Sequence, residues 1–279
     1  MSRIYMTTDL EGASGVIQES QSFGERYESA RISLTRDVNA AVLGARDAGA
    51  EFIVVEDGHG HNSGYNFIYE DLVDGARYQL GGPRASFAQE LDASFTAAFT
   101  VAFHAMAGTQ GAIMDHTQSS RAIVSIHLND REIGELGMFA YAAGFHGVPV
   151  ALVTGDDKTA EEARELLGEQ VVTAVVKYAC KRTSALCLPP GEARELIRAR
   201  AAEAVRAAGS MRPLELPKGS CELRAQYLRS EMCEGFWART DVEMVDARTV
   251  IFRRDNALDA MNAYCGLHFP PVGPPTAGW

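Results

Sequence analysis

Two acidic residues follow the first apolar run of the chain, and their position constrains how this end of the protein can fold. Residues 4–6 (Ile-Tyr-Met) predict a buried β-strand, and Asp9 and Glu11 stand where that strand should end at a Gly-rich turn. Side chains at positions i and i+2 of a strand lie on the same face. Two like charges on one side of a buried strand are unfavourable unless a cation compensates them, so the pair indicates a metal site. If the strand ends earlier, both acids are solvated loop residues, and these positions alone leave both interpretations open.

The composition describes a globular chain without a strongly basic region. With 279 residues and 46% hydrophobic content, the chain is long enough for one large domain or for a main domain with a smaller partner. Its formal net charge of −11 and sequence pI near 5.1 argue against a nucleic acid or an anionic membrane as a partner.

The cysteines and the N-terminus indicate the compartment. The five cysteines show no CxxC spacing, which fits neither a disulfide framework nor a thiolate zinc site, so we expect reduced thiols. The N-terminus runs directly into a predicted strand without a basic n-region or an apolar h-region, and no apolar run approaches the ~18 residues that span a bilayer. We therefore expect a cytoplasmic protein that has no membrane partner.

Strands and helices alternate through the first two thirds of the chain. A helix predicted over residues 27–48 and a strand over residues 51–55 follow the first strand, which makes a βαβ unit and a parallel strand pair. We expect further strands at 76–80, 95–103, 148–154 and 171–176, a hairpin at 122–135, and helices at 137–145 and 158–167. The predicted fold class is therefore α/β, with a mostly parallel sheet flanked by helices.

The pattern changes near residue 188, where we place a boundary. Residues 1–188 would form the α/β metal-binding catalytic domain, and residues 189–279 would form a smaller C-terminal α+β subdomain. For this second part we expect helices at 192–208 and 256–267, and strands at 221–227, 242–245 and 249–252. The Pro-rich tail at 270–275 is incompatible with a regular helix or sheet, and we expect it to run over the surface or to pack on a neighbouring subunit.

Potential metal ligands stand at the ends of the predicted strands. The five residues are Asp9 and Glu11 after the first strand, His59 after the second, His104 after the strand at 95–103, and Glu135 after the hairpin. The carboxyl ends of parallel strands meet at one edge of a sheet, where ligands bind. Three carboxylates and two divalent cations leave a charge of +1 for a bound hydroxide to neutralise. Oxygen and imidazole ligands suit Zn²⁺, Mn²⁺ or Co²⁺ in a hydrolytic site. A carboxylate that bridges two metals would hold them about 3.5–4 Å apart. Asp9 is our candidate for this bridging ligand.

Each of these positions also has a purely structural interpretation. His104 could be a buried histidine satisfied by a backbone carbonyl, and His59 and His61 compete for one role. Glu135 could be an acid favoured by the dipole at a helix N-terminus. The acidic pair at 156–157 also follows a strand, but it precedes a helix and is expected to cap it.

Five segments of the chain resemble the M55 family of D-aminopeptidases, which are dizinc peptidases. These segments are Tyr5-Met-Thr-Thr-Asp-Leu-Glu-Gly12, Glu56-Asp-Gly-His59, Phe103-His-Ala105, Met114-Asp-His116 and Asn129-Asp-Arg-Glu-Ile-Gly-Glu-Leu-Gly137. The similarity covers most of residues 3–190. In that family an Asp-x-Glu pair, two separate histidines and the Glu of a Gly-Glu-Leu-Gly block bind two zinc ions. The resemblance therefore implies the same five ligands here, Asp9, Glu11, His59, His104 and Glu135, and it implies a catalytic role for His116.

The resemblance also implies an activity and an assembly. The expected function is that of a dizinc aminopeptidase, which releases an N-terminal residue, D-alanine or a similar D-amino acid, from short peptides by attack of metal-bound hydroxide. The family proposal makes His116 a nucleophile, but a general acid/base or oxyanion-stabilising role is physically easier beside two metals. Family members assemble into large rings, so we expect a homo-oligomer such as a decameric ring.

Three other functions are compatible with the same ligands. The first is a metal-dependent amidase or peptidase that acts on L-peptides or on non-peptide amides. The second is a metallophosphoesterase, because two-metal carboxylate and imidazole sites also hydrolyse phosphates. The third is a non-catalytic binding protein on the same scaffold. Stereospecificity is read by the shape of a pocket, which one sequence does not display.

Overall fold

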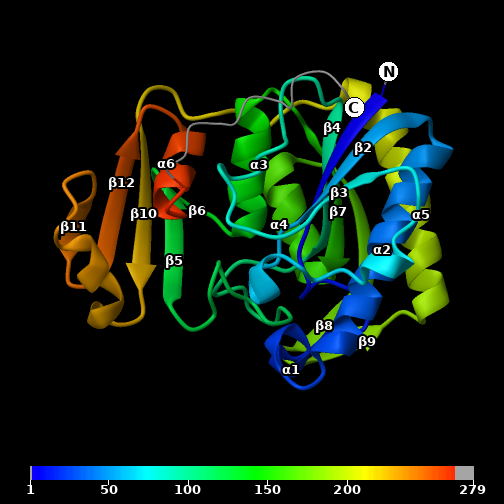
Figure 1. The fold of residues 1–279 in the computed structure, drawn as a ribbon, viewed down its shortest axis with the longest axis horizontal. Helices are drawn as coiled ribbons and strands as arrows, with labels where there is room; N and C mark the ends of the chain where they lie inside the picture. The colour runs from blue at the N-terminus through cyan, green and yellow to red at the C-terminus, as the bar shows by residue number, and fades with distance from the viewer. Residues whose placement is uncertain (1, 268–279) are drawn as a thin grey trace.

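The computed structural model describes residues 2–267, and its largest element is a seven-stranded sheet (Figure 1). The strands stand in the order β3-β2-β1-β4-β7-β8-β9, and every neighbouring pair is parallel except β8 with β9. The bounds are β1 Ser2–Thr8, β2 Ala50–Asp57, β3 Arg77–Gln79, β4 Ala97–Phe103, β7 Val150–Asp156, β8 Val172–Lys181 and β9 Ser184–Cys187. Strand β4 is buried at every position, as is usual for a central parallel strand that is covered on both faces.

Helices cover both faces of this sheet. Helices α2 (Tyr27–Asp47) and α5 (Pro190–Ala207) pack against each other and on one face, while α3 (Glu135–Phe145) and α4 (Asp157–Leu167) contribute to the core on the other face. Alternation along β1 separates the two cores, because Ile4 and Met6 join the first and Tyr5 joins the second. The remaining helices are α1 (Glu19–Phe23) and α6 (Ala257–Tyr264), with 3₁₀ turns at His61–Ser63, Tyr69–Asp71, Ala208–Ser210 and Ser230–Phe236.

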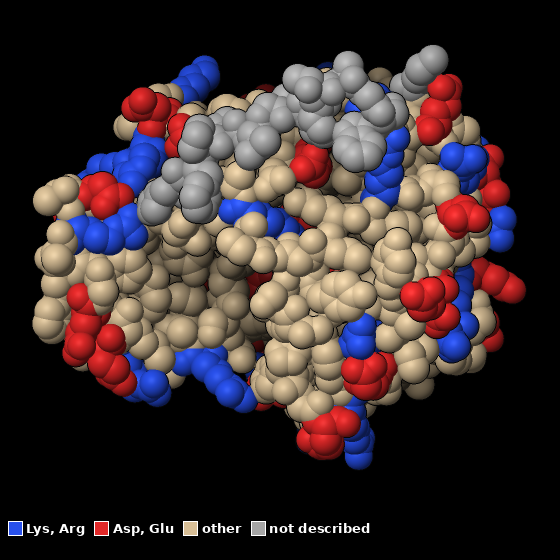
Figure 2. All heavy atoms as spheres, in the orientation of Figure 1, with Lys and Arg blue, Asp and Glu red and all other residues tan. Residues whose placement is uncertain are grey.

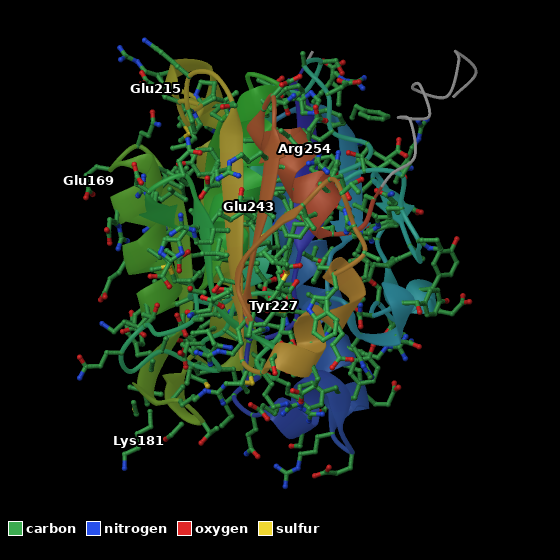
Figure 3. The ribbon with its side chains drawn as sticks, turned by 90° about the vertical axis from the view of Figure 1, so that its left-hand side faces the viewer. Glu169, Lys181, Glu215, Tyr227, Glu243 and Arg254 are labelled. Carbon is green, nitrogen blue, oxygen red and sulfur yellow. The ribbon has the colours of Figure 1, made fainter. Side chains whose placement is uncertain are left out.

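A second, antiparallel sheet stands beside the first in the order β11-β12-β10-β5-β6. Its strands are β5 Ile123–Leu128, β6 Arg131–Glu132, β10 Cys221–Tyr227, β11 Glu243–Asp246 and β12 Thr249–Arg254. Figure 3 shows this sheet toward the viewer, with Tyr227 at the end of β10 and Glu243 on β11. Helix α6 packs on β10 and β12 and closes a separate apolar core.

Helix α3 connects the two sheets because it is apolar on all sides. Leu136 and Phe139 belong to the core of the first sheet, whereas Met138 and Tyr141 belong to the core of the second. A helix that is hydrophobic around its whole circumference is buried on every side. The first residue of α3, Glu135, is therefore held in place relative to both sheets.

The prediction of an α/β fold with a mostly parallel sheet, flanking helices and a smaller α+β part is confirmed. The predicted hairpin at 122–135 is also present as β5 and β6, although β5 pairs with β10 in the second sheet. Strand β8 continues to Lys181, beyond the predicted end at residue 176, because β9 pairs with it in an antiparallel hairpin. The sequence pattern did not indicate that hairpin.

The chain passes between the two sheets more than once. Strands β5 and β6 precede residue 188 and pair in the second sheet, while α5 follows residue 188 and packs on α2. The proposed division of the chain into residues 1–188 and 189–279 stays a prediction, and the Pro-rich tail lies outside the described residues. Among residues 2–267, no helix combines the length and the apolar character that a membrane span requires.

Candidate metal centre

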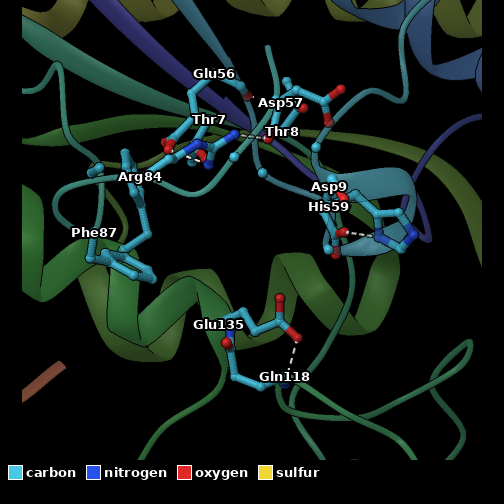
Figure 4. A pocket seen from close by; sticks show the side chains of 18 of the residues that line it. Thr7, Thr8, Asp9, Glu56, Asp57, His59, Arg84, Phe87, Gln118 and Glu135 are labelled. Atoms are coloured by element: carbon cyan, nitrogen blue, oxygen red, sulfur yellow. Dashed lines mark hydrogen bonds and ion pairs between the residues drawn. The ribbon is translucent and has the colours of Figure 1, made fainter. Parts of the chain in front are cut away.

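Three neighbouring strands place the predicted ligands at one edge of the first sheet (Figure 4). Asp9 directly follows β1, His59 comes two residues after β2, and His104 directly follows β4. Glu135 begins α3 and points into the space that these strand ends surround. The structure therefore brings together side chains that are up to 126 positions apart in the chain (135 − 9 = 126).

A close approach between two backbone segments fixes the turn that carries Glu11. Pairing of β1 with β4 continues past the strand end, because the Asp9 amide donates to Val101 and the Gly12 amide donates to Ala102, at 3.0 and 2.8 Å. A Cβ atom on Gly12 would lie 1.9 Å from the carbonyl oxygen of Phe103. Only glycine fits at this position, and the turn presses the acidic segment against the end of β4.

The five side chains form two groups that share one carboxylate. In the first group, Nδ1 of His59 lies 2.9 Å from Oδ1 of Asp9 and 3.2 Å from Oε2 of Glu11. In the second group, Nε2 of His104 lies 3.0 Å from Oδ2 of Asp9 and 3.4 Å from Oε1 of Glu135. The two oxygens of Asp9 thus face different histidines, which is the arrangement of a carboxylate that bridges two metal ions.

The histidines are oriented as metal ligands usually are. The second ring nitrogen of each faces a backbone carbonyl, at 3.3 Å for His59 (Ser22) and 2.9 Å for His104 (Ala105). Since a carbonyl oxygen only accepts, the nitrogen facing it carries the hydrogen, and a neutral ring turns a lone pair toward the carboxylates. Lone pairs and carboxylate oxygens repel each other at these distances, so either a proton or a cation must lie between them.

Unpartnered buried atoms fit a metal better than a proton. Asp9, Glu11 and His104 have 4%, 3% and 2% of their surface exposed. Oδ2 of Asp9, Oε2 of Glu11 and Nε2 of His104 have no hydrogen-bond partner, although charged groups lie within 3.4 Å of them. Buried polar atoms are ordinarily satisfied. All three atoms lack hydrogen-bond partners, and oxygen and nitrogen atoms are the ligands that zinc and similar divalent ions prefer. These atoms therefore fit a metal site.

Protons would compete with a metal for these side chains. Burial acts to raise the pKa of Glu135, but the neighbouring His104 and His116 outweigh it and lower the pKa to about 2. Burial acts to lower the pKa of His104, but Glu135 and Asp9 raise it well above the ordinary value for histidine. Because a metal can bind only after these imidazoles lose their protons, metal affinity should fall as the pH falls.

His116 lies against the second group. Its ring stacks on that of His104 with centroids 4.0 Å apart and an interplanar angle of 10°. Its Nδ1 faces the carbonyl oxygen of Met114 at 2.8 Å, and its Nε2 lies 3.7 Å from Oε1 of Glu135, which also accepts from the Gln118 amide. His104, His116 and Glu135 together could hold one ion. The geometry is therefore compatible both with a catalytic role for His116 and with a role as a further ligand.

The residues that competed for these roles do not join the two groups. His61 is exposed, and its ring packs edge-on against Tyr27 with centroids 4.6 Å apart. Asp156 caps α4 by accepting from the Thr159 amide at 2.7 Å, as the sequence predicted. Asp157 instead accepts from the Ala179 amide on β8.

A cavity of about 450 Å³ opens beside the two groups. Asp9, His59 and Glu135 line it on one side, and Arg84 and Phe87 line it on the other (Figure 4). In the space-filling view the molecule is hollowed between its two parts, and positive and negative side chains are intermixed around this face (Figure 2). The cavity therefore gives a small molecule access to the candidate ligands.

The far wall of the cavity contains residues that the sequence reasoning missed. Arg84 pairs with the buried carboxylate of Glu56 at 2.6 Å, and the second oxygen of Glu56 accepts from the Tyr5 hydroxyl at 2.7 Å. Phe87 presents its ring to the cavity. Arg84 and Phe87 do not directly follow a strand and belong to no recognisable motif, so only the folded chain could reveal them.

Comparisons with known proteins identify the family of this chain. The profile of the peptidase family M55, described as D-aminopeptidase, matches residues 2–265. A D-aminopeptidase of Bacillus subtilis (strain 168) is 34% identical over 218 residues, which are 77% of this chain and 78% of the relative. The solved structure of the Zn-dependent D-aminopeptidase DppA from Bacillus subtilis, described as a self-compartmentalizing protease, matches with a TM-score of 0.86 and 30% identity over 95% of this chain and 96% of that chain.

The fold and the family match place the chain among the metal-dependent hydrolases. The chain belongs to the M55 peptidase family, which confirms the predicted resemblance and the prediction of a metallo-aminopeptidase of the D-aminopeptidase type. Zinc is the metal named for the related structure.

Replacement of the shared carboxylate should affect both ligand groups. We expect Asp9→Asn to abolish most zinc binding and to remove the rise in thermal stability that zinc gives the wild-type protein, about 4 kcal/mol at a zinc concentration of 1,000 Kd. Elemental analysis and thermal melts with and without zinc measure both effects. Asp115→Asn is the matched control, because Asp115 pairs with Arg182 at 3.1 Å and should leave zinc binding intact. Full zinc content in Asp9→Asn would contradict a shared ligand.

Proposed function

We propose that this protein is a dizinc aminopeptidase that removes the N-terminal residue from short peptides, with a preference for D-alanine or a similar D-amino acid. The observation that carries the proposal is the pair of ligand groups joined by Asp9 beside an open cavity. Membership of the M55 family supports the aminopeptidase class. The D preference is supported by the relatives, which are described as D-aminopeptidases.

The proposed ligand sets correspond to the two groups. One ion would be held by Asp9, Glu11 and His59, and the other by Asp9, His104 and Glu135. When bound, the two ions would polarise the scissile carbonyl and supply a nucleophilic water near neutral pH. Mn²⁺ or Co²⁺ would suit the same oxygen and nitrogen donors.

The side chains of the protein would position the substrate and move protons. A cavity of about 450 Å³ is at the small end of ligand pockets and would accept a short peptide rather than a folded protein. His116 stacks on His104, with Nδ1 held by a backbone carbonyl, so Nε2 is the atom that would exchange a proton with the reacting groups. We assign His116 a general acid/base or oxyanion-stabilising role rather than that of a nucleophile.

We also propose that the chain forms a homo-oligomer, such as a decameric ring, and works in the cytoplasm. The related structure is described as a self-compartmentalizing protease, and enclosure of the active sites would further restrict substrates to short peptides. All five cysteines are free, which suits a reducing compartment.

Matched peptides test the substrate class. We expect zinc-loaded protein to hydrolyse D-Ala-D-Ala and D-Ala amide and to turn over L-Ala-L-Ala and L-Ala amide much more slowly, because both relatives are described as D-aminopeptidases. Release of free alanine gives the rates. Preference for the L series, or for non-peptide amides, would indicate an amidase of another specificity. Turnover of a generic phosphodiester without amide hydrolysis would indicate a phosphoesterase, and no turnover of any substrate would leave a binding protein.

Removal of the His116 imidazole tests its role. We expect His116→Ala to keep both zinc ions and to lose about 10²–10⁴-fold in kcat on D-Ala-D-Ala, as is typical when a general acid/base is removed. His127→Ala is the control, since His127 lies on β5 in the second sheet and should not alter turnover. Loss of a zinc ion from His116→Ala would make His116 a ligand instead, and near-normal turnover would exclude a catalytic role.

A further inference from the structure

One lysine is buried completely next to the candidate metal centre. Lys177 on β8 has no exposed surface, and its ammonium group donates to three backbone carbonyls. The acceptors are Glu11 at 2.5 Å, Ala13 at 3.0 Å and Val16 at 2.5 Å. Lysine is almost never fully buried unless it is paired, so a specific interaction must offset the loss of hydration.

The three acceptors require a lysine rather than another donor. An ammonium group directs three hydrogens from a single atom, whereas the guanidinium of arginine is a planar fork and neutral side chains offer fewer donors. Lys177 is also held rigidly, because β8 pairs at this position with Asp156 of β7 on one side and with Cys187 of β9 on the other. The acceptors therefore converge on a fixed point in the sheet.

All three carbonyls belong to the loop that follows β1 and carries Glu11. The same loop is also held by Asp37 of α2, which accepts from the amide and the hydroxyl of Ser14 at 2.7 and 3.0 Å. The amide of Gly12 binds the end of β4. Lys177 contacts Glu11 itself, through the carbonyl oxygen of the residue whose side chain faces His59, so it holds the same peptide unit as the Gly12 amide from the side of the carbonyl.

We propose that Lys177 is a positioning residue that holds the backbone of Glu11 so that its carboxylate is ready for one of the two metal ions. The inference rests on the proposed dizinc site, and it makes the β8–β9 hairpin part of the support of that site. Loss of Lys177 should weaken the binding of one zinc ion more than that of the other, because Glu11 belongs to one ligand group only. A merely structural lysine would instead affect stability without distinguishing between the two ions.

Zinc affinity in the full-length protein tests the proposal. In competition with a chromogenic chelator, we expect Lys177→Met to weaken one of the two zinc-binding steps by about 10–100-fold, the usual effect of removing a group that orients a ligand. The other step should keep its wild-type affinity. Glu11→Gln should weaken the same step, and adding Lys177→Met to Glu11→Gln should cause little further loss, because both changes act on one ligand. Wild-type affinity at both steps in Lys177→Met would overturn the proposal.

Two controls separate this result from other failures. Ile197→Ala creates a cavity in the buried face of α5 and should lower stability while both zinc affinities stay unchanged. If zinc affinity falls in parallel with stability in this variant too, the effect of Lys177→Met is structural and the proposal fails. Binding of fewer than two ions by the wild-type protein would instead refute the dizinc site. The effect of Lys177→Met on the affinity for the remaining ion would still decide whether Lys177 supports a ligand.

Hydrogen exchange in the wild-type protein gives a test that needs no variant. If Lys177 orders the loop before metal binds, the amides of residues 11–16 should be as protected in zinc-free protein as the strand ends beside them. Zinc should then change their exchange by less than about threefold. Fast exchange of this segment that slows only when zinc is added would overturn the proposal, because the metal rather than the lysine would order the loop.

Discussion

Buried carboxylates and imidazoles lie within ion-pair distance of one another at the ends of β1, β2 and β4, and the surrounding fold is organised around this cluster. Asp9 faces His59 with one oxygen and His104 with the other, at 2.9 and 3.0 Å, while Glu11 and Glu135 complete the two sides. Such a cluster is unfavourable without cations, since several of its atoms are buried and lack hydrogen-bond partners. Two divalent ions that share one carboxylate, as we propose, would remove the repulsion and satisfy these atoms together.

The fold supplies the rigidity that such a cluster requires. Parallel strands place their carboxyl ends along one edge, so Asp9 and His104 have little freedom relative to each other. Helix α3 packs in the cores of both sheets and presents Glu135 from the opposite side. The loop with Glu11 is not part of a strand, and it is fastened instead by Lys177 and Asp37. Each ligand thus has its own support in the surrounding structure.

Local sequence patterns were sufficient to predict where the strands end and that acidic and histidine side chains meet there. The positions of Asp9, His59 and His104 could be predicted because apolar and β-branched runs, followed by polar residues, mark where each strand ends. Such patterns could not predict which sheet the hairpin at 122–135 would join, since that pairing depends on β10, almost a hundred residues later. The role of Lys177 was hidden for the same reason. Its acceptors lie more than 160 positions away, and the β9 strand that extends β8 past it has a weak pattern of its own. Arg84 and Phe87 lie in an irregular segment whose place beside the cavity is set by tertiary packing alone.

The positions of bound zinc ions would show whether two ions share Asp9. Crystals of the zinc-loaded protein, measured on both sides of the zinc absorption edge, would show the ions by their anomalous scattering. We expect two peaks per chain, about 3.5–4 Å apart. One peak should contact Asp9, Glu11 and His59, and the other should contact Asp9, His104 and Glu135. A single peak, or two peaks that do not share Asp9, would contradict a dizinc site joined by this carboxylate.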